Sequence, residues 1–334
     1  MDTIMEKEIV KIINKALDDT PLTKEELIKM FSVSDLSEEA FAIRKAGRDY
    51  SERLLNHKAE IHGQIGIDAG LCPRRCKFCS FSCINNAFPK HIEFSHEEII
   101  RDVQSLEAQG ANAIYLMATA SYKFEKYIDL AKDVFKHRQT DIPIIANIDD
   151  FDSDKATELK KLGFAGVYHA IRIGEGSDTG IPLKKRLASI QAAKDAGLYV
   201  GMCVEPIGPE HSLAEIAEKT LYTRDLGAVF SGAMRRTNIP TSPLKKHGQS
   251  TYLRMATLVA AVSLATGNKV TGNCTHEPNA LGVNAGANLL WAEVGSNPRD
   301  NNAETVRGLT VARCKDLYHE CGWDVLSGPS KFFM

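Results

Sequence analysis

Residues 70–83 read GLCPRRCKFCSFSC, and this stretch directly follows the first short apolar segment of a repeating strand, loop and helix pattern. It contains four of the eight cysteines in the chain, and Cys72, Cys76 and Cys79 have the spacing C-x3-C-x2-C. Three thiolates on one loop are too few for a closed tetrahedral zinc site, which has four protein ligands. They suit a [4Fe–4S] cluster that leaves one iron without a protein ligand. A structural zinc loop completed by Cys83 is the alternative.

The sequence around this loop alternates short apolar segments with predicted amphipathic helices. The predicted strands are residues 63–68, 113–118, 142–148, 166–173, 199–205, 228–235, 269–274 and 288–294. The predicted helices between them are residues 96–109, 124–137, 154–162, 183–196, 213–226 and 251–266. This alternation predicts an α/β fold, a TIM-type (β/α)8 barrel over residues 61–325, with a helical N-terminal extension (1–60) and a C-terminal tail (326–334). An open doubly wound sheet is the alternative, although no G-x-G-x-x-G follows the first strand.

The composition is that of an ordinary soluble protein. The chain has 334 residues, of which 43% are hydrophobic and 25% charged, and its net charge is −2. This balance gives no indication of nucleic-acid or membrane binding. Apolar runs are too short to span a bilayer, and the charged N-terminus lacks the apolar core of a signal peptide. We therefore expect a cytoplasmic protein with reduced thiols, where clustered cysteines indicate metal binding or catalysis.

The remaining cysteines fall at two kinds of position. In a parallel barrel the chemistry lies at the C-terminal ends of the strands. Cys203 lies near the end of the fifth predicted strand and Cys274 at the end of the seventh, so both are expected at the same mouth as the cysteine loop. Cys314 and Cys321 lie seven residues apart in a C-terminal helix, and we predict that they are packing residues.

The C-x3-C-x2-C motif, with the aromatic Phe78 before its third cysteine, resembles the radical S-adenosylmethionine (SAM) superfamily. The resemblance implies that the open iron chelates the methionine amine and carboxylate of SAM, and that one-electron reduction yields a 5′-deoxyadenosyl radical. It implies that Phe78 and Ile207 flank adenine, that Thr119 and Ser121 contact the methionine amine, and that Arg172 and Glu175 hold the ribose and carboxylate. A structural ion pair for Arg172 and Glu175, and simple loop polarity for Thr119 and Ser121, are the alternatives.

Within that superfamily the chain most resembles the biotin synthase group, through CKFCSF, IGPEH, TSPL (241–244) and AGAN (285–288). In biotin synthases a second iron–sulfur cluster has cysteine ligands on strands two, three and five and an arginine on strand seven. The second and third predicted strands here have no cysteine. Cys203 and Cys274 could still anchor a different second cluster, with Cys83 as the favoured third ligand and Cys321 as the other choice. Alternatively, Cys203 and Cys274 are buried thiols that pack as small hydrophobic residues.

Polar residues at other strand ends are candidate substrate contacts. Arg235 and Arg236 end the sixth predicted strand and could clamp a substrate carboxylate. His276 and Glu277 could bind substrate or a metal, and Asn147 follows strand three together with Asp149 and Asp150. The alternatives are solvated surface arginines and a strand-end hydrogen-bond network.

Three functions remain open at this point. The first is biotin synthase-like sulfur insertion into dethiobiotin. The second is a radical enzyme with one cluster, of the type that makes the iron-guanylylpyridinol hydrogenase cofactor, matures hydrogenase or synthesises methylornithine. The third is a non-catalytic metal-binding barrel. The radical functions imply a small-molecule substrate and a reductant such as flavodoxin or ferredoxin, and homodimers are common in this group.

Overall fold

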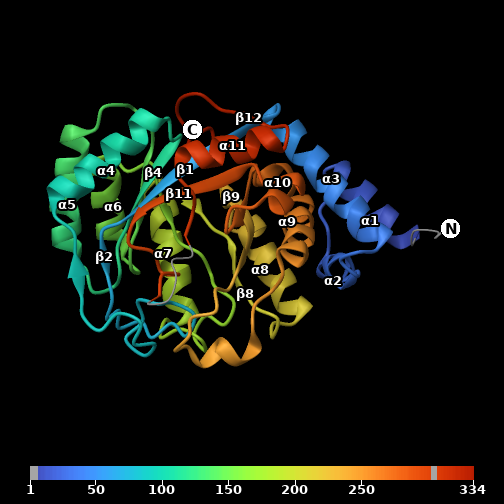
Figure 1. Cartoon of the computed structure of the whole chain (residues 1–334), viewed down its shortest axis with the longest axis horizontal. Helices are drawn as coiled ribbons and strands as arrows, with labels where there is room; N and C mark the ends of the chain where they lie inside the picture. The colour runs from blue at the N-terminus through green and yellow to red at the C-terminus, as the bar shows by residue number, and fades with distance from the viewer. Residues whose placement is uncertain (1–6, 302–306) are drawn as a thin grey trace.

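The computed structural model describes residues 7–301 and 307–334, and in it a parallel sheet curls into a barrel (Figure 1). Its strands are β1 (Lys58–Gly66), β4 (Ala113–Met117), β5 (Ile144–Asn147), β6 (Gly166–Tyr168), β7 (Tyr199–Gly201), β8 (Val204–Ile207), β9 (Phe230–Arg235), β10 (Gly272–His276) and β11 (Leu289–Gly295). The sheet order is β7-β6-β5-β4-β1-β11-β10-β9-β8. Because only Met202 and Cys203 separate β7 from β8, the two edges of the sheet meet and the barrel closes. The predicted α/β barrel is confirmed.

Helices cover the outside of this barrel. They are α4 (His96–Gln109), α5 (Phe124–His137), α6 (Ser153–Leu162), α7 (Leu183–Asp195), α8 (Leu213–Asp225), α9 (Tyr252–Thr266), α10 (Ala280–Asn284) and α11 (Val311–Glu320). Local sequence sets their ends. Ser95 and Glu98 form a capping box at the start of α4, and Gly110 ends that helix in the left-handed conformation.

The first strand begins earlier than the sequence predicts. We expected residues 63–68, whereas β1 starts at Lys58 and runs to Gly66. Its early part pairs with β12 (Asp324–Val325), a partner that lies too far along the chain for a local pattern to indicate. After β1, the short strand β2 (Asp68–Ala69) pairs with β3 (Ile92–Glu93) and brackets the cysteine loop.

Three N-terminal helices pack on one flank of the barrel: α1 (Lys7–Leu17), α2 (Lys24–Ser32) and α3 (Glu38–Leu55). Helix α3 lies against α9 so closely that a Cβ added at Gly47 would be 2.6 Å from the Ala260 side chain. Apolar residues of these helices share one core with α8 and α9. No helix in the described part of the chain is both long and apolar enough to cross a bilayer.

The C-terminal tail closes the end of the barrel opposite the cysteine loop (Figure 1). The backbone amide of Lys331 donates to the Glu60 carboxylate at 2.8 Å, and Phe332 and Phe333 are buried beside His62. These two rings join an apolar group that we call the barrel-interior cluster. Its members are Ala113, Tyr115, Ile145, Cys203, Phe230, Met234, Cys274, Leu289, Trp291, Phe332 and Phe333.

Candidate active site

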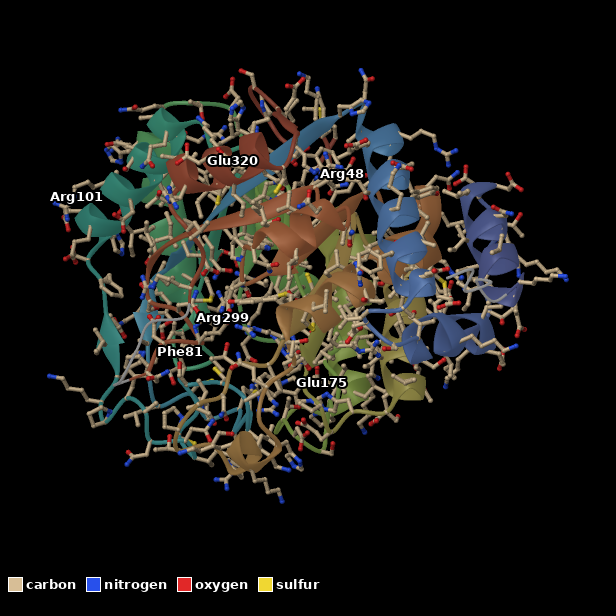
Figure 2. All side chains as sticks on the ribbon, turned by 45° about the vertical axis from the view of Figure 1, so that its right-hand side comes forward. Arg48, Phe81, Arg101, Glu175, Arg299 and Glu320 are labelled. Carbon is tan, nitrogen blue, oxygen red and sulfur yellow. The ribbon has the colours of Figure 1, made fainter. Side chains whose placement is uncertain are left out.

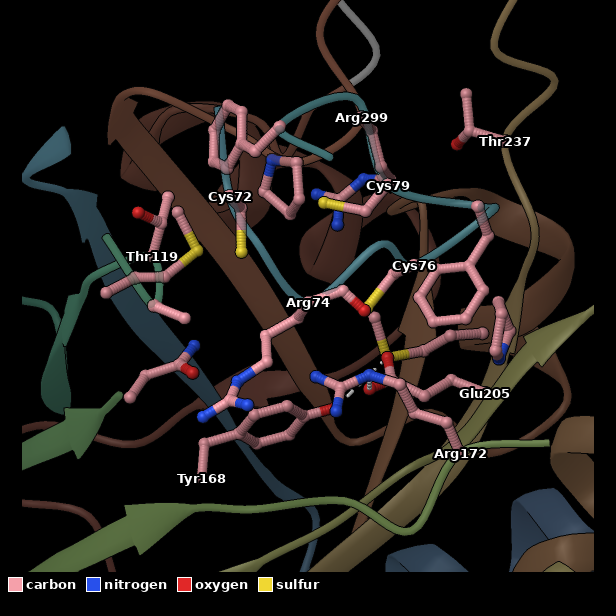
Figure 3. Close-up of a pocket in the computed structure, with 18 of the residues that line it drawn as sticks. Cys72, Arg74, Cys76, Cys79, Thr119, Tyr168, Arg172, Glu205, Thr237 and Arg299 are labelled. Atoms are coloured by element: carbon pink, nitrogen blue, oxygen red, sulfur yellow. Dashed lines mark hydrogen bonds and ion pairs between the residues drawn. The ribbon is translucent and has the colours of Figure 1, made fainter. Parts of the chain in front are cut away.

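The cysteine loop lies over the mouth of the barrel. Arg299 and Phe81 lie at this end of the molecule, whereas Arg101 and Glu320 lie on the outer helices (Figure 2). Cys72, Cys76 and Cys79 line a single cavity, and their sulfur atoms point into it (Figure 3). The cavity holds about 1280 Å³ of empty space, counting the solvent at its mouth.

Hydrogen bonds hold the cysteine loop in shape. The Asn85 amide nitrogen donates to the carbonyl oxygens of Cys76, Lys77 and Cys79 at 3.2, 3.0 and 2.8 Å. Other loops at the mouth brace it from outside, since the Lys77 amide donates to the Asp178 carbonyl at 2.9 Å and the Ser80 amide donates to the Pro298 carbonyl at 2.9 Å. The loop is therefore held by hydrogen bonds from within and from neighbouring loops.

The chemistry of the three thiols fits an iron–sulfur cluster with one open iron. Burial raises the pKa of Cys72 and Cys79, and it raises the pKa of Cys76 to about 11, so metal binding must displace a proton from each. Among the described residues that line the cavity there is no fourth cysteine. Cys83, which a closed zinc site would need, is exposed and does not line the cavity.

Arginine side chains form much of the rest of the cavity wall. Six guanidinium groups and two carboxylates line it in the described part of the chain, and each guanidinium is paired with a carboxylate at the wall or behind it. The arginines are Arg74, Arg172, Arg186, Arg235, Arg236 and Arg299, and the carboxylates are Asp149 and Glu205. These guanidinium groups can donate hydrogen bonds to a carboxylate or another oxyanion, although carboxylates of the protein already balance their charge.

Arg172 and Glu175, which we predicted to act together on SAM, lie on different sides of the cavity wall. Arg172 lines the cavity and faces Glu205, with 3.6 Å between Nε and Oε1 (Figure 3). Glu175 lies behind the wall, where its carboxylate accepts hydrogen bonds from the Thr179 hydroxyl at 2.6 Å and from the Arg172 backbone amide at 3.1 Å. Glu175 thus shapes the loop that carries Arg172.

The other predicted SAM contacts also separate into two groups. Phe78 and Thr119 line the cavity, and the Thr119 hydroxyl donates to the buried Asp68 carboxylate at 2.5 Å. Ser121 does not line the cavity, and its hydroxyl donates to the Leu71 carbonyl at 3.1 Å. Ile207 is buried in the core shared with α8 and α9 and does not line the cavity.

The three predicted substrate contacts all line the cavity. Arg235 donates to the Glu277 carboxylate at 2.6 Å, and its guanidinium lies 3.8 Å from the centre of the Tyr252 ring. Asn147 donates to the Gln64 side chain at 3.4 Å. These contacts hold both side chains at the wall.

His276 is the third of these contacts, and its ring stacks on Trp291 at an interplanar angle of 13°. Its Nε2 lies 3.0 Å from Arg299 and 3.3 Å from Glu293. Burial and the Arg299 charge lower the pKa of His276, although Glu293 opposes them, and the ring is therefore neutral near pH 7. Its buried Nδ1 has no hydrogen-bond partner in the described structure, which leaves that nitrogen for a ligand.

The structure brings Cys203 and Cys274 together and leaves Cys83 apart. The two sulfur atoms lie 3.0 Å from each other, and both residues are buried in the barrel-interior cluster below the cavity. Within the described ranges, no three Cys, His, Asp or Glu side chains gather closely enough to hold one metal ion. The predicted packing role of Cys314 agrees with its full burial on α11, whereas Cys321 is half-buried.

Sequence reasoning missed several lining residues. Arg74 forms a bidentate ion pair with Asp149, with 2.7 Å between Nε and Oδ1. Its position inside the cysteine motif could have indicated that it lines the cavity. Glu205 lies on β8, at the end of the fifth predicted strand and two residues before Ile207, which we associated with adenine. Arg299 follows β11 in a loop without a motif, and only the fold shows that this loop returns to the mouth.

Comparisons with known proteins agree with this geometry. A family model for the radical SAM superfamily matches residues 68–219. The biotin synthase of Clostridioides difficile is 24% identical over 59% of this chain, and that of Rhodopirellula baltica is 24% identical over 65%. The matches span 63% and 61% of those enzymes, or about three fifths of their length.

Solved structures show the same fold at low sequence identity. Methylornithine synthase (PylB) is 16% identical with a TM-score of 0.77, covering 96% of this chain and 98% of that one. HydG, a maturase of the [FeFe]-hydrogenase, is also 16% identical with a TM-score of 0.77, covering 95% of this chain and 76% of that one.

Proposed function

We propose, from the premise that this chain belongs to the radical SAM superfamily and is similar to biotin synthases, that it is an enzyme with one catalytic [4Fe–4S] cluster acting on a small anionic substrate. One observation carries the proposal. Three thiols from one braced loop line an arginine-rich cavity at the mouth of a barrel, and no fourth cysteine lines that cavity in the described chain.

Cys72, Cys76 and Cys79 would hold the cluster. Together with SAM, the bound cluster supplies a 5′-deoxyadenosyl radical that abstracts hydrogen from the substrate. The residues of the chain would bind and orient SAM and the substrate and would shield the radical. Arg172 and Thr119 line the cavity and would give polar contacts to a SAM molecule bound at the loop. Phe78 also lines the cavity and would give an apolar contact. The barrel wall keeps water from a reactive carbon centre.

The substrate would bind on the side of the cavity formed by β9, β10 and β11. Arg235 supplies a fixed positive charge there, and its buried Nε has no hydrogen-bond partner in the described structure. His276 offers its free Nδ1, and Asn147 offers an amide from the opposite wall. A carboxylate or another oxyanion would accept hydrogen bonds from the Arg235 Nε and from the Asn147 amide.

A second candidate is biotin synthase-like sulfur insertion from an auxiliary cluster into dethiobiotin. The similarity to biotin synthases and the position of Cys203 and Cys274 below the cavity favour it. Iron and sulfide analysis separates the two candidates. One cluster gives about four iron and four sulfide ions per chain. A second cluster adds iron, and the double variant C203A/C274A loses that added iron. Sulfur insertion also requires that the protein form biotin from dethiobiotin.

The main test is SAM cleavage. Anaerobically reconstituted protein is mixed with SAM, dithionite and a panel of small carboxylates, and 5′-deoxyadenosine is measured by chromatography. We expect formation by the wild type and by C83A, whose side chain is exposed, and none by C76A. No 5′-deoxyadenosine from protein with an intact cluster, with any member of the panel, would contradict the proposal. We further propose that flavodoxin or ferredoxin replaces dithionite in the cell.

A further inference from the structure

The contact between Cys203 and Cys274 crosses an intervening strand. Cys203 lies in the break between β7 and β8, and Cys274 lies on β10, while β9 runs between β8 and β10. The residue of β9 that is level with Cys274 is Gly232. Because that residue has no side chain, the two thiols can meet over it.

Gly232 is required for this contact in two ways. Its φ is +132°, a conformation that residues with a side chain rarely adopt. A Cβ at this position would lie 2.7 Å from the Cys274 sulfur and 2.2 Å from the Cys274 carbonyl oxygen. The broken strand at Cys203 and the glycine at 232 together allow the two sulfur atoms to meet.

The distance between the sulfur atoms fits a thiol pair better than two ligands of one metal ion. Two thiolates on one tetrahedral metal stay roughly 3.8 Å apart, as follows from metal–sulfur bonds of about 2.3 Å. The separation here is 3.0 Å, which lies between that value and a disulfide bond of about 2.05 Å. The neighbours are the rings of Tyr168, Phe230 and Trp291, which are not ligands of iron–sulfur clusters.

We propose that Cys203 and Cys274 are a redox-active dithiol that closes reversibly into a disulfide across the barrel. In the oxidation two S–H bonds break and one S–S bond forms, and two electrons and two protons pass to a two-electron acceptor such as a diazene, which becomes a hydrazine. A small dithiol reverses the reaction by thiol–disulfide exchange. The inference goes beyond the proposed function and does not depend on it.

The disulfide would act on the floor of the cavity. Met234 and Trp291 belong to the barrel-interior cluster with both thiols, and Tyr168 packs against it. All three also line the cavity. Drawing the sulfur atoms together moves β8 toward β10 beneath these side chains, so the shape of the floor depends on the oxidation state of the pair.

Thiol mapping tests this inference. Anaerobic holoenzyme is incubated with the diazene diamide until the labelling is constant, then unfolded in acid, alkylated and analysed by peptide mass spectrometry. We expect Cys203 and Cys274 to lose their label together, so that six of the eight cysteines are labelled, and a linked pair of peptides to appear. Dithiothreitol should restore both labels. Buried Cys314, which lies 3.6 Å from the Trp291 carbonyl and contacts no thiol among the described residues, should keep its label throughout.

The single variants C203S and C274S are the matched controls, and in each the remaining thiol should stay labelled after diamide. Full labelling of both thiols in treated wild type would overturn the inference. So would iron above four per chain that C203S/C274S removes, since the thiols would then be cluster ligands. SAM cleavage is measured in a separate assay. Failure of the disulfide inference therefore leaves the proposed function unaffected, and failure of the proposed function leaves the disulfide inference unaffected.

Discussion

The Arg172 guanidinium faces the Glu205 carboxylate across the cavity wall, with 3.6 Å between Nε and Oε1. Burial alone would lower the pKa of Arg172, but the carboxylates of Glu205 and Glu175 more than offset it and raise that pKa. Arg172 is therefore charged at every pH at which the enzyme folds. A permanent charge in this place is suited to a carboxylate or a sugar hydroxyl of SAM.

Replacing this charge should weaken SAM binding. A hydrogen bond to a charged group contributes about 1.5–3 kcal/mol, so R172Q should raise the Kd for SAM roughly 10- to 100-fold. Equilibrium dialysis with cluster-loaded enzyme measures the change. R101Q is the matched control, because Arg101 points outward from α4 (Figure 2). Equal affinities in R172Q and R101Q would show that Arg172 has no part in SAM binding.

The Asn85 amide should control retention of the cluster. In N85D a carboxylate of the same shape would face the carbonyl oxygens of Cys76, Lys77 and Cys79, and three attractions would become repulsions. We expect iron after reconstitution to fall by at least about half, since each lost bond costs about 1 kcal/mol. N86D changes the exposed neighbour and should retain wild-type iron. Full iron content in N85D would contradict this role.

The barrel and its helices could be predicted because local patterns specify them. The predicted helices 96–109 and 124–137 coincide with α4 and α5, because both have helical periodicity and α4 also begins at a capping serine. The cysteine spacing likewise lies within one loop. Such short-range signals do not depend on how distant segments meet.

The directions of side chains in the site could not be predicted in the same way. Ser121 and Glu175 lie in the expected loops, but hydrogen bonds to Leu71 and Thr179 turn them away from the cavity. The meeting of Cys203 with Cys274 depends on Gly232, on a third strand. No sequence spacing records a contact that three distant segments make together.

His169 should make stability depend on pH. It is buried 3.0 Å from Asp150, and burial together with the Arg186 charge lowers its pKa to about 4. The pKa of histidine in an unfolded chain is about 6.5. Between pH 6.5 and 4 the unfolded state therefore binds more protons than the folded state. The stabilising contribution is therefore present above pH 6.5 and is lost as the pH falls toward 4.

The measurement is the free energy of unfolding in urea between pH 7 and 5. We expect the slope for the wild type to exceed that for H169Q by up to about 1.4 kcal/mol per pH unit, which corresponds to one proton. Although burial would raise the pKa of Asp150, His169 and Arg186 hold it at about 2, so Asp150 does not titrate in this range. Replacement of exposed His319 is the control, and identical slopes in wild type and H169Q would contradict the assignment.

Phe333 should stabilise the barrel without affecting its chemistry. Its ring is 6% exposed and lies 5.9 Å from His62, at the end opposite the cysteine loop. Removing a buried phenylalanine side chain costs about 3–5 kcal/mol, so F333A should lower the Tm by at least about 5 °C. Met334 is 62% exposed, and M334A should leave the Tm unchanged. Below its Tm, F333A should still form 5′-deoxyadenosine, because Phe333 does not line the cavity. If F333A unfolds at the same temperature as M334A, the tail does not hold the barrel closed.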